Sequence, residues 1–388
     1  MRNGHFIDLS FKFVNKYNLY FRDSLLLLPG SLSSLAKNFG TSSNENKRVA
    51  CIFPYKFVNN EQISLNYIDP APAFKFFDGI SQDEYNSYSS QFNNNWNLKS
   101  ETIKYCELDC YVLYQIIDKF SCAADNIFKM FRIDLLKYPT LSSLAFAIYR
   151  SKILKDDAQI PLIHGEIYEF IKKSYTGGSV DVYKPIPTVR EPKVTEETLI
   201  RRYDVNSLYP FAMKEFPMPS DNPVYFEGDI MKTYNHNNDL ADLDKPFGIF
   251  EVDIETPKDI KIPLLQTKVK VKNGTYRTIA PIGNWTGCNF SDKLYNTARH
   301  GYTFKVKRGY LFEKADLFSD YINFLFDLKQ NSEAGSPYYI ISKLLLNSLY
   351  GRMGMNPISE QHKIVTSDEA LELYPKINVT NILNLKNG

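Results

Sequence analysis

Apolar residues recur at helical spacing in three stretches of the first half of the chain. Those between residues 99 and 120 share one helical face: Ile103, Cys106, Cys110, Leu113 and Ile117. Ser100 stands where a helix cap is expected. Residues 141–154 and 165–175 predict two further helices, and the mix of short strands and helices extends over the first 165 residues. Paired glycines and two prolines then predict a domain junction near residues 175–190.

Alternating apolar and polar residues predict a strand at residues 247–255. Phe250, Val252 and Ile254 fall on one face of this strand. Its other face carries three carboxylates, those of Glu251, Asp253 and Glu255. Three acidic side chains in a row could bind a metal, but a solvated sheet face is the simpler interpretation.

A β-hairpin is predicted at residues 267–279, turning at Asn273-Gly274. We expect its polar face to carry four basic side chains: Lys268, Lys270, Lys272 and Arg277. Such a ribbon could follow a phosphate backbone. A strand edge protected by lysine gives the same pattern, so the sequence favours neither interpretation.

Two helices are predicted in the last hundred residues. The first runs from a cap at Ser291 to Gly301. The second has Ser336 as its cap, Pro337 in its first turn and Gly351 as its terminator. Lys343, Asn347 and Tyr350 form one stripe on it, which suits a triphosphate, a base edge and a ring, although solvated helix faces look similar.

The segment YDVNSLYPFAM, residues 203–213, places an aspartate where an alternating stretch meets a turn. We expect a strand to end at Asp204 and a helix to begin near Ser207. A carboxylate in that position needs a cation or hydrogen-bond donors around it. The simplest interpretation is that Asp204 caps the helix.

Composition indicates a folded protein with more than one domain. Of 388 residues, 44% are hydrophobic and 14% aromatic. The formal net charge of +2 neither requires nor excludes a nucleic-acid partner. No apolar run reaches the ~20 residues that span a bilayer, and residues 1–13 lack the features of a signal or transit peptide.

The five cysteines and five histidines form no recognisable catalytic or metal set. Cys106 and Cys110 share a helix face and could ligate a metal, but no further ligands accompany them. We therefore expect reduced and mostly buried cysteines.

Two motifs carry a family resemblance. DVNSLYP at residues 204–210 and KLLLNSLYG at residues 343–351 resemble the D-x-x-S-L-Y-P and K-x3-N-S-x-Y-G motifs of family B DNA polymerases. The stretch between them resembles, in length and character, the insertion found in the protein-primed branch of this family, whose members come from bacteriophages, adenoviruses and linear mitochondrial plasmids. YTGG at residues 175–178 and YCELD at residues 105–109 are similar to that branch's linker and third exonuclease motifs, and residues 22–40 resemble the stretch before the latter.

The resemblance implies a nucleotide site and its metal ions. Asp204 and the carbonyl oxygen of Val205 would bind Mg²⁺. The nucleotide-binding residues would be Asn206, Ser207, Leu208, Tyr209, Lys343, Asn347, Tyr350 and Lys329. Tyr209 would exclude the 2′-hydroxyl, and Lys343 would neutralise the triphosphate.

The resemblance also implies DNA contacts outside this site. Tyr105 and Asp109 would belong to an exonuclease centre, with Lys47 as a weaker match; by itself, a tyrosine one helical turn from a surface carboxylate is common. Tyr175, Gly177 and Gly178 would contact DNA. A plain domain-joining turn is the alternative for these last three residues.

Several family motifs are not found in the chain. The Y-x-D-T-D-S hairpin, which supplies the second palm carboxylate, is absent after Gly351, where residues 366–374 predict an ordinary capped helix. The first two exonuclease motifs are absent as well. We therefore expect a fragment without robust synthesis or proofreading of its own.

The implied fold is α+β. Its parts would be a truncated ribonuclease-H-like 3′-5′ exonuclease domain (1–174), a linker and first palm segment (175–224), an inserted subdomain (225–318), fingers helices (319–352) and the start of a return to the palm (353–388). The implied function is DNA-directed DNA synthesis, with template-primer DNA, dNTPs and a terminal priming protein as partners and the mitochondrion as location. The alternative is a catalytically inactive remnant that binds DNA or the priming protein; a stand-alone exonuclease is disfavoured.

Overall fold

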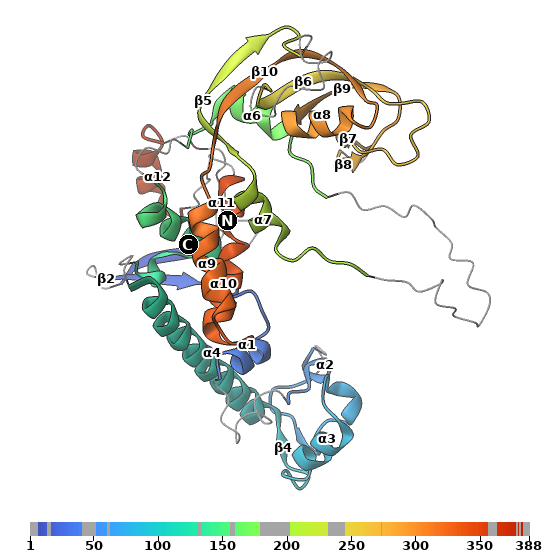
Figure 1. The fold of residues 1–388 in the computed structure, drawn as a ribbon. Coiled ribbons are helices and arrows are strands. Elements are labelled where there is room, and N and C mark those ends of the chain that lie inside the picture. Colours follow the sequence, from blue (N-terminus) through green and yellow to red (C-terminus); the bar gives the residue numbers. More distant parts are fainter. Residues whose placement is uncertain are drawn as a thin grey trace, which may run out of the picture.

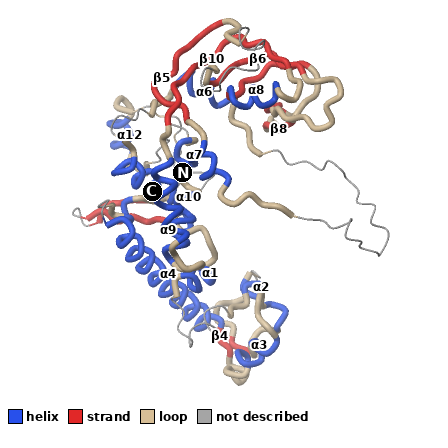
Figure 2. The backbone as a smooth tube through the Cα atoms, viewed as in Figure 1, coloured by secondary structure: helices blue, strands red, loops and turns tan. Residues whose placement is uncertain are grey.

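The computed structural model arranges the chain as three packed regions along one long axis (Figure 1). It describes residues 7–13, 17–40, 52–59, 63–129, 133–155, 160–178, 202–231, 245–272, 274–355 and 363–377, with residues 379 and 382. A sheet unit lies at one end, a helical layer in the middle and a small aromatic unit at the other end (Figure 2). None of the described helices is both long and apolar enough to cross a membrane.

The small unit is held together by aromatic side chains around Trp96. It contains α2 (Tyr55–Val58), β3 (Ile68–Asp69), the 3₁₀ turn η2 (Phe74–Phe76), α3 (Gln82–Ser89) and β4 (Trp96–Asn97). The Trp96 side chain is fully buried, and its indole N–H donates to the Tyr88 hydroxyl at 2.8 Å. Burial is also the main reason why the pKa of Tyr88 is raised.

Helix α4 (Leu98–Phe128) connects this unit to the helical layer. The Asn97 side chain accepts a hydrogen bond from the Ser100 N–H, so Asn97, and not Ser100, is the N-cap. Ile116, Phe120, Ala124 and Phe128 are buried in the carboxyl half of the helix. The predicted helix at 99–120 is confirmed and extends further.

The helical layer buries the largest apolar cluster of the chain. The layer comprises η1 (Ser24–Leu26), α1 (Leu32–Asn38), η4 (Leu135–Lys137), α5 (Leu141–Ile148), α7 (Leu208–Glu215), α9 (Ser319–Gln330), α10 (Pro337–Leu346) and α11 (Leu349–Met353). The predicted helix at 141–154 becomes a π-helix, η5 (Tyr149–Ile153), after Ile148. The buried Tyr149 hydroxyl donates to the Leu317 carbonyl oxygen at 2.9 Å, and this bond ties the π-turn to the start of α9.

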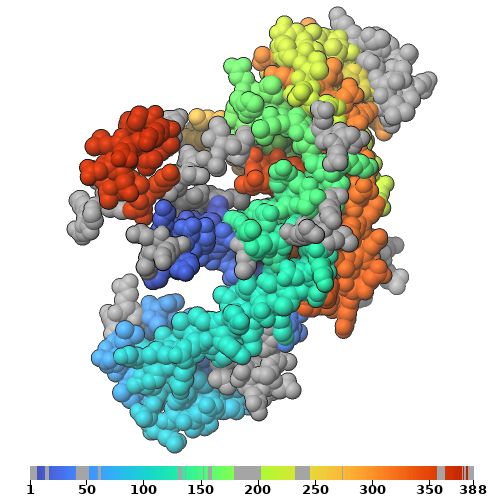
Figure 3. Space-filling model, turned by 90° about the vertical axis from the view of Figure 1, so that its left-hand side faces the viewer, coloured from blue at the N-terminus to red at the C-terminus, as the bar shows by residue number. Residues whose placement is uncertain are grey.

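Two elements extend from the layer. β1 (Asp8–Phe13) and β2 (Tyr17–Arg22) form an antiparallel hairpin of their own. The predicted helix at 366–374 is confirmed as α12 (Ser367–Leu373). Thr366 and Glu369 form a capping box at its amino terminus. In the space-filling view α12 stands out from the surface beside the amino-terminal residues (Figure 3).

The sheet unit is a four-stranded antiparallel sheet with the order β5-β10-β6-β9. The strands are β5 (Met218–Glu227), β6 (Gly248–Glu255), β9 (Asn284–Phe290) and β10 (Thr303–Ala315). Helix α6 (Gly165–Lys173) packs on the face that contains Ile249 and Tyr310. Helix α8 (Ser291–Ala298) packs its Leu294 against Phe250 and Val252 on the other face.

The predicted alternation in β6 is confirmed, with a buried apolar face. Its carboxylates are bound across the sheet: Arg308 Nε lies 2.6 Å from Glu251, and Lys307 lies 2.9 Å from Asp253. A separate hairpin, β7 (Thr267–Lys270) and β8 (Tyr276–Ile279), confirms the predicted ribbon. In α8 the N-cap is Phe290, because the Ser291 hydroxyl instead accepts from the Gly248 N–H at 3.1 Å.

Most of the predicted junction at 175–190 lies outside the described residues, since only 175–178 are described. The described cysteines are free, as expected of reduced thiols, but the prediction that they are mostly buried is wrong. Cys106, Cys110 and Cys122 are exposed, and Cys288 is partly buried with its pKa raised to about 11 by burial. The reason is that α4 packs its Ile116 and Phe120 side against the core, which leaves Cys106 and Cys110 toward solvent.

Replacement of Gly309 by alanine is expected to destabilise the sheet unit. A Cβ there would meet the Ile249 carbonyl oxygen and lie 2.9 Å from the Phe250 ring. Such overpacking costs about 1–3 kcal/mol of the free energy of unfolding. Gly287→Ala is the control, because its Cβ makes only ordinary contacts, the nearest at 3.5 Å. Urea unfolding followed by tryptophan fluorescence measures both, with Trp285 reporting from β9; equal stability of the two variants contradicts the packing argument.

Candidate functional site

The two motifs separated by more than a hundred residues meet at a pair of tyrosine rings. Tyr209 of α7 and Tyr350 of α11 stack with ring centroids 4.5 Å apart and an interplanar angle of 15°. Tyr209 is 57% exposed and Tyr350 40% exposed, so the stack forms at the surface. An accessible aromatic platform of this kind can accept a further flat ring or a sugar.

Helix α7 holds its part of the motif in place by burying two residues on one helical face. Pro210 and Met213 are buried, and Met213 belongs to the large core cluster. Ser207 before them has φ 55° and ψ 44°, a left-handed conformation that turns the chain sharply into the helix. Leu208, Tyr209 and Phe211 consequently remain exposed on the outer side. The main-chain N–H groups of Ser207 and Leu208 lie at the helix start, where the helix dipole favours an anion.

Helix α10 presents the predicted stripe. Lys343, Asn347 and Tyr350 are exposed, while Leu345 and Leu346 are buried. The Asn347 amide donates to the Lys343 carbonyl oxygen at 2.9 Å, which places the two side chains on consecutive turns of one face. None of the described carboxylates forms an ion pair with Lys343. The ammonium is therefore available to an external anion.

The end of α10 differs from the prediction. The helix ends at Leu346, because Asn347 bonds back to Lys343 and the Ser348 hydroxyl donates to the Leu344 carbonyl oxygen at 2.5 Å. Gly351 lies inside the next short helix, α11, so its predicted role as terminator is wrong. The break after Leu346 re-aims the chain and brings Tyr350 over Tyr209.

Lys329 has a partner within its own helix pair. Its ammonium lies 5.6 Å from the centre of the Tyr339 ring, at the hairpin formed by α9 and α10. The structure thus engages Lys329 in a cation–π contact, unlike Lys343.

Asp204 lies in an irregular, exposed segment five residues before Tyr209. The expected strand is not formed at residues 202–205, since no described strand pairs with them; the residues before 202 lie outside the described part. The cap interpretation is also wrong, because no side chain caps α7. Within the described ranges nothing donates a hydrogen bond to the Asp204 carboxylate.

The donor set around Asp204 fits a single magnesium ligand and not a complete two-ion centre. Asp204 offers carboxylate oxygens and Val205 a carbonyl oxygen, both suited to a hard cation. The described residues contain no group of three or more acidic, cysteine or histidine side chains that could hold a metal ion. The described residues therefore do not complete a two-ion centre.

A second cluster forms where α4 meets α2. The hydroxyls of Tyr105 and Tyr55 are hydrogen-bonded to each other, and the Tyr105 ring stacks on Phe53 with centroids 4.7 Å apart. Burial raises the pKa of Tyr105, and hydrogen bonds with Tyr55 and Asp109 add to this shift. Tyr105 and Asp109 thus lie within hydrogen-bonding reach of each other. The sequence missed Tyr55 because no periodic pattern connects residues 50 positions apart; Lys47 lies outside the described residues.

The Tyr175-Gly177-Gly178 turn follows α6 directly. The Lys293 ammonium of α8 donates to the Thr176 hydroxyl at 2.8 Å and so fixes the turn to the sheet unit. No atom lies within 4 Å of the Cβ position of Gly177 or Gly178, which leaves room for another chain to approach. Partial burial raises the pKa of Tyr175.

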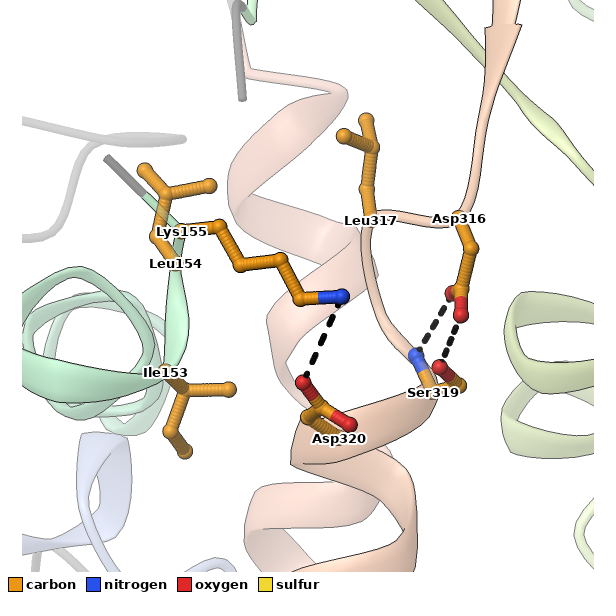
Figure 4. A pocket seen from close by; sticks show the side chains of 7 residues that line it. All are labelled: Ile153, Leu154, Lys155, Asp316, Leu317, Ser319 and Asp320. Carbon is orange, nitrogen blue, oxygen red and sulfur yellow. Dashed lines mark hydrogen bonds and ion pairs between the residues drawn. The ribbon is translucent and has the colours of Figure 1, made fainter. Parts of the chain in front are cut away.

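Two hollows in the described surface are occupied by structural interactions. One, of about 10 Å³, lies where β10 passes into α9 (Figure 4). There Lys155 points toward Asp320 at 3.8 Å, and Asp316 accepts from the Ser319 N–H at 3.1 Å. The other is a shallow depression of about 450 Å³ over β6, β9 and β10, where Asp253 is bound by Lys307 and by the Thr286 hydroxyl at 2.5 Å. The charged groups named in both hollows are thus engaged by neighbouring residues of the chain.

Comparison with protein families adds an independent finding. Residues 1–388 match the family model described as DNA polymerase type B, organellar and viral. The chain is 41% identical over 399 residues to a Neurospora intermedia protein named "Probable DNA polymerase", covering 100% of this chain and 39% of that protein. An Ascobolus immersus protein of the same name is 37% identical, covering 98% and 30%.

A solved structure shares the fold. The Phi29 DNA polymerase matches with a TM-score of 0.54 and 20% identity, over 90% of this chain and 52% of that one. The mixed helix and sheet architecture is therefore that of this polymerase fold. The chain spans less than half the length of the two fungal relatives and about half of the phage chain.

Removal of either ring of the stack is expected to release the other. In a double-mutant cycle, Tyr209→Ala and Tyr350→Ala should show a coupling of about 0.5–1.5 kcal/mol in the free energy of unfolding. Tyr374, exposed beside α12, serves as the control partner for Tyr209→Ala and should show none. A zero coupling between Tyr209 and Tyr350 would show that the rings do not stack in solution.

Proposed function

The chain belongs to the organellar and viral type B DNA polymerases, and on that premise we propose that it supplies the nucleotide-binding part of a DNA-directed DNA polymerase of the protein-primed type. The observation that carries the proposal is the stack of Tyr209 on Tyr350, because it joins the two motifs at one accessible surface. The remaining chemistry follows from the residues around this stack.

The triphosphate of an incoming dNTP would lie between α7 and α10. The unpaired ammonium of Lys343 would neutralise phosphate charge, assisted by the N–H groups at the start of α7. Asn347 would orient the nucleotide, and Tyr350 would pack against its base pair. Tyr209 would lie under the sugar and exclude a 2′-hydroxyl. Lys329 contributes less in this proposal, since it is held by Tyr339.

The reaction would be phosphoryl transfer by positioning and charge neutralisation. The primer 3′-hydroxyl gives up its proton to water, and its oxygen forms a bond to the α-phosphorus of the dNTP. The bond between the α-phosphorus and the oxygen that bridges to the β-phosphorus breaks, and pyrophosphate leaves. Magnesium supplies charge stabilisation in such transfers when bound. Asp204 and Val205 would provide part of its ligand set, and this chain's described residues do not complete it.

The proposed partners are template-primer DNA, dNTPs and a terminal priming protein, and the proposed location is the mitochondrion. A solved structure of similar fold supports the first two partners: a Phi29 DNA polymerase structure is described as complexed with primer-template DNA and incoming nucleotide substrates. Tyr175, Gly177 and Gly178 would contact that DNA. The domain limits drawn from the sequence are part of the same proposal, with Tyr105 and Asp109 in an exonuclease-like centre.

One observation favours a second function. Among the described residues Asp204 belongs to no group of three or more side chains that could hold a metal ion, which suits a protein that binds DNA or the priming protein and does not synthesise DNA. Primer extension with Mg²⁺ and dNTPs separates the two functions. A signal that disappears in Asp204→Ala supports polymerisation, and equal signals from both proteins support the binding function.

Nucleotide binding is expected to depend on Lys343. A fluorescent dATP should bind Lys343→Ala about tenfold or more weakly, because a charge-assisted contact is lost. Lys99→Ala, which removes an exposed lysine on α4, is the matched control and should bind normally. In Tyr209→Ala the ratio of the affinity for dATP to the affinity for ATP should fall, because the ring that excludes the 2′-hydroxyl is lost. Equal affinities of Lys343→Ala and Lys99→Ala would place the triphosphate elsewhere.

A further inference from the structure

The hairpin β7–β8 separates its basic residues by face. In its antiparallel register Lys268 stands opposite Thr278, and Lys270 opposite Tyr276. Directly opposed residues share a face, so Lys268, Lys270, Tyr276 and Thr278 lie together, and the exposed Lys272 follows in the turn after β7. We call these five residues the lysine face.

Arg277 is not part of the lysine face. It stands opposite Val269, and Thr267 stands opposite Ile279 on the same side. The expectation that Arg277 shares a face with the lysines is therefore wrong, because the register places it one residue out of phase. The hairpin has one face with lysines and a tyrosine and another that is mainly apolar and β-branched.

Among the described residues no carboxylate pairs with the lysines of the lysine face. Between residues 257 and 283 the sequence holds one acidic residue, Asp259, against five lysines and Arg277. No ion pair joins Lys268, Lys270 or Lys272 to a described carboxylate. In the adjoining sheet, by contrast, Lys307 and Arg308 are both paired across strands. The lysines of the hairpin are also exposed.

Protection of a strand edge does not explain this arrangement. The two strands form a sheet of their own, outside the four-stranded sheet (Figure 1). A single charge on an edge is enough to discourage pairing with another chain. Here Lys268 and Lys270 lie on one face beside Tyr276, which is 69% exposed, and Lys272 follows in the adjoining turn. An exposed tyrosine among lysines is a feature of surfaces that bind single-stranded nucleic acid.

We propose that the lysine face binds single-stranded DNA, with Lys268, Lys270 and Lys272 on successive phosphates and Tyr276 stacked on an unpaired base. Alternate residues of a strand lie about 6.6 Å apart, a spacing comparable to that of neighbouring phosphates on an extended strand. Single-stranded DNA fits better than duplex, because paired bases expose no free ring face to Tyr276. The choice of DNA rests on the proposed function, but the contact is separate from the nucleotide site.

The test measures binding of a fluorescent oligo(dT) by the full chain as a function of salt. In Lys268→Gln/Lys270→Gln/Lys272→Gln the slope of log affinity against log salt should fall by about 2, because each single-strand phosphate contact contributes about 0.7. Tyr276→Ala should weaken binding roughly tenfold at every salt concentration, and Tyr276→Phe should not. Lys37→Gln/Lys99→Gln/Lys137→Gln removes the same charge from exposed lysines elsewhere and is the control.

Several outcomes overturn the proposal. One is an unchanged slope of log affinity against log salt in the triple-lysine variant of the hairpin. Another is an equal fall of the slope in the control variant, which would indicate an effect of net charge alone. Equal loss of affinity for a blunt duplex, with no effect of Tyr276→Ala, would assign the face to duplex DNA. Binding of fluorescent dATP by the hairpin variant separates a failure of this proposal from a failure of the proposed function. The affinity of the hairpin variant for dATP should equal that of the unsubstituted chain. Failure of dATP binding in both proteins, with oligo(dT) binding intact, would reject the nucleotide site alone.

Discussion

Two buried tyrosine hydroxyls fix the helical layer on which the rest of the structure depends. Tyr321 donates to the Leu345 carbonyl oxygen at 3.0 Å, and Tyr149 donates to the Leu317 carbonyl oxygen at 2.9 Å. Both side chains are fully buried, and burial raises the pKa of both. A buried hydroxyl without a hydrogen-bond partner lowers the free energy of unfolding. Each bond therefore fixes the relative position of the two segments that it joins. The first joins α9 to α10, and the second joins the π-turn after α5 to the corner that leads into α9.

This layer explains why the candidate nucleotide site can be exposed and still be ordered. Lys343, Asn347, Tyr350 and Tyr209 all face outward, so their own contacts contribute little to stability. Their backbones are held from behind by buried neighbours, such as Met213 on α7 and Leu345 on α10. A rigid support with a polar, accessible front is the arrangement that ligand positioning requires. Asp204 differs, since it precedes α7 in a segment without a described strand partner.

Charge is organised differently in the two β-structures. In the four-stranded sheet Glu251 and Asp253 of β6 are paired across the strands with Arg308 and Lys307 of β10, so these four charges compensate one another. The neighbouring hairpin has basic residues with almost no acidic ones near them in sequence. A chain with a formal net charge of +2 thus still carries a locally cationic surface. The total charge gave no indication of this surface.

The sequence by itself determined the local elements and supplied the candidate site residues. Helical spacing predicted α4, α6, α10 and α12, and alternation predicted β6 and the hairpin, because these periods follow from backbone geometry. Tertiary structure decided what local patterns do not encode. It ended α10 at Leu346, moved Gly351 into α11, left Cys106 and Cys110 exposed and brought Tyr55 to Tyr105. It also stacked Tyr209 on Tyr350. Contacts between residues far apart in the chain depend on how the buried faces pack together, and no window of sequence contains that information.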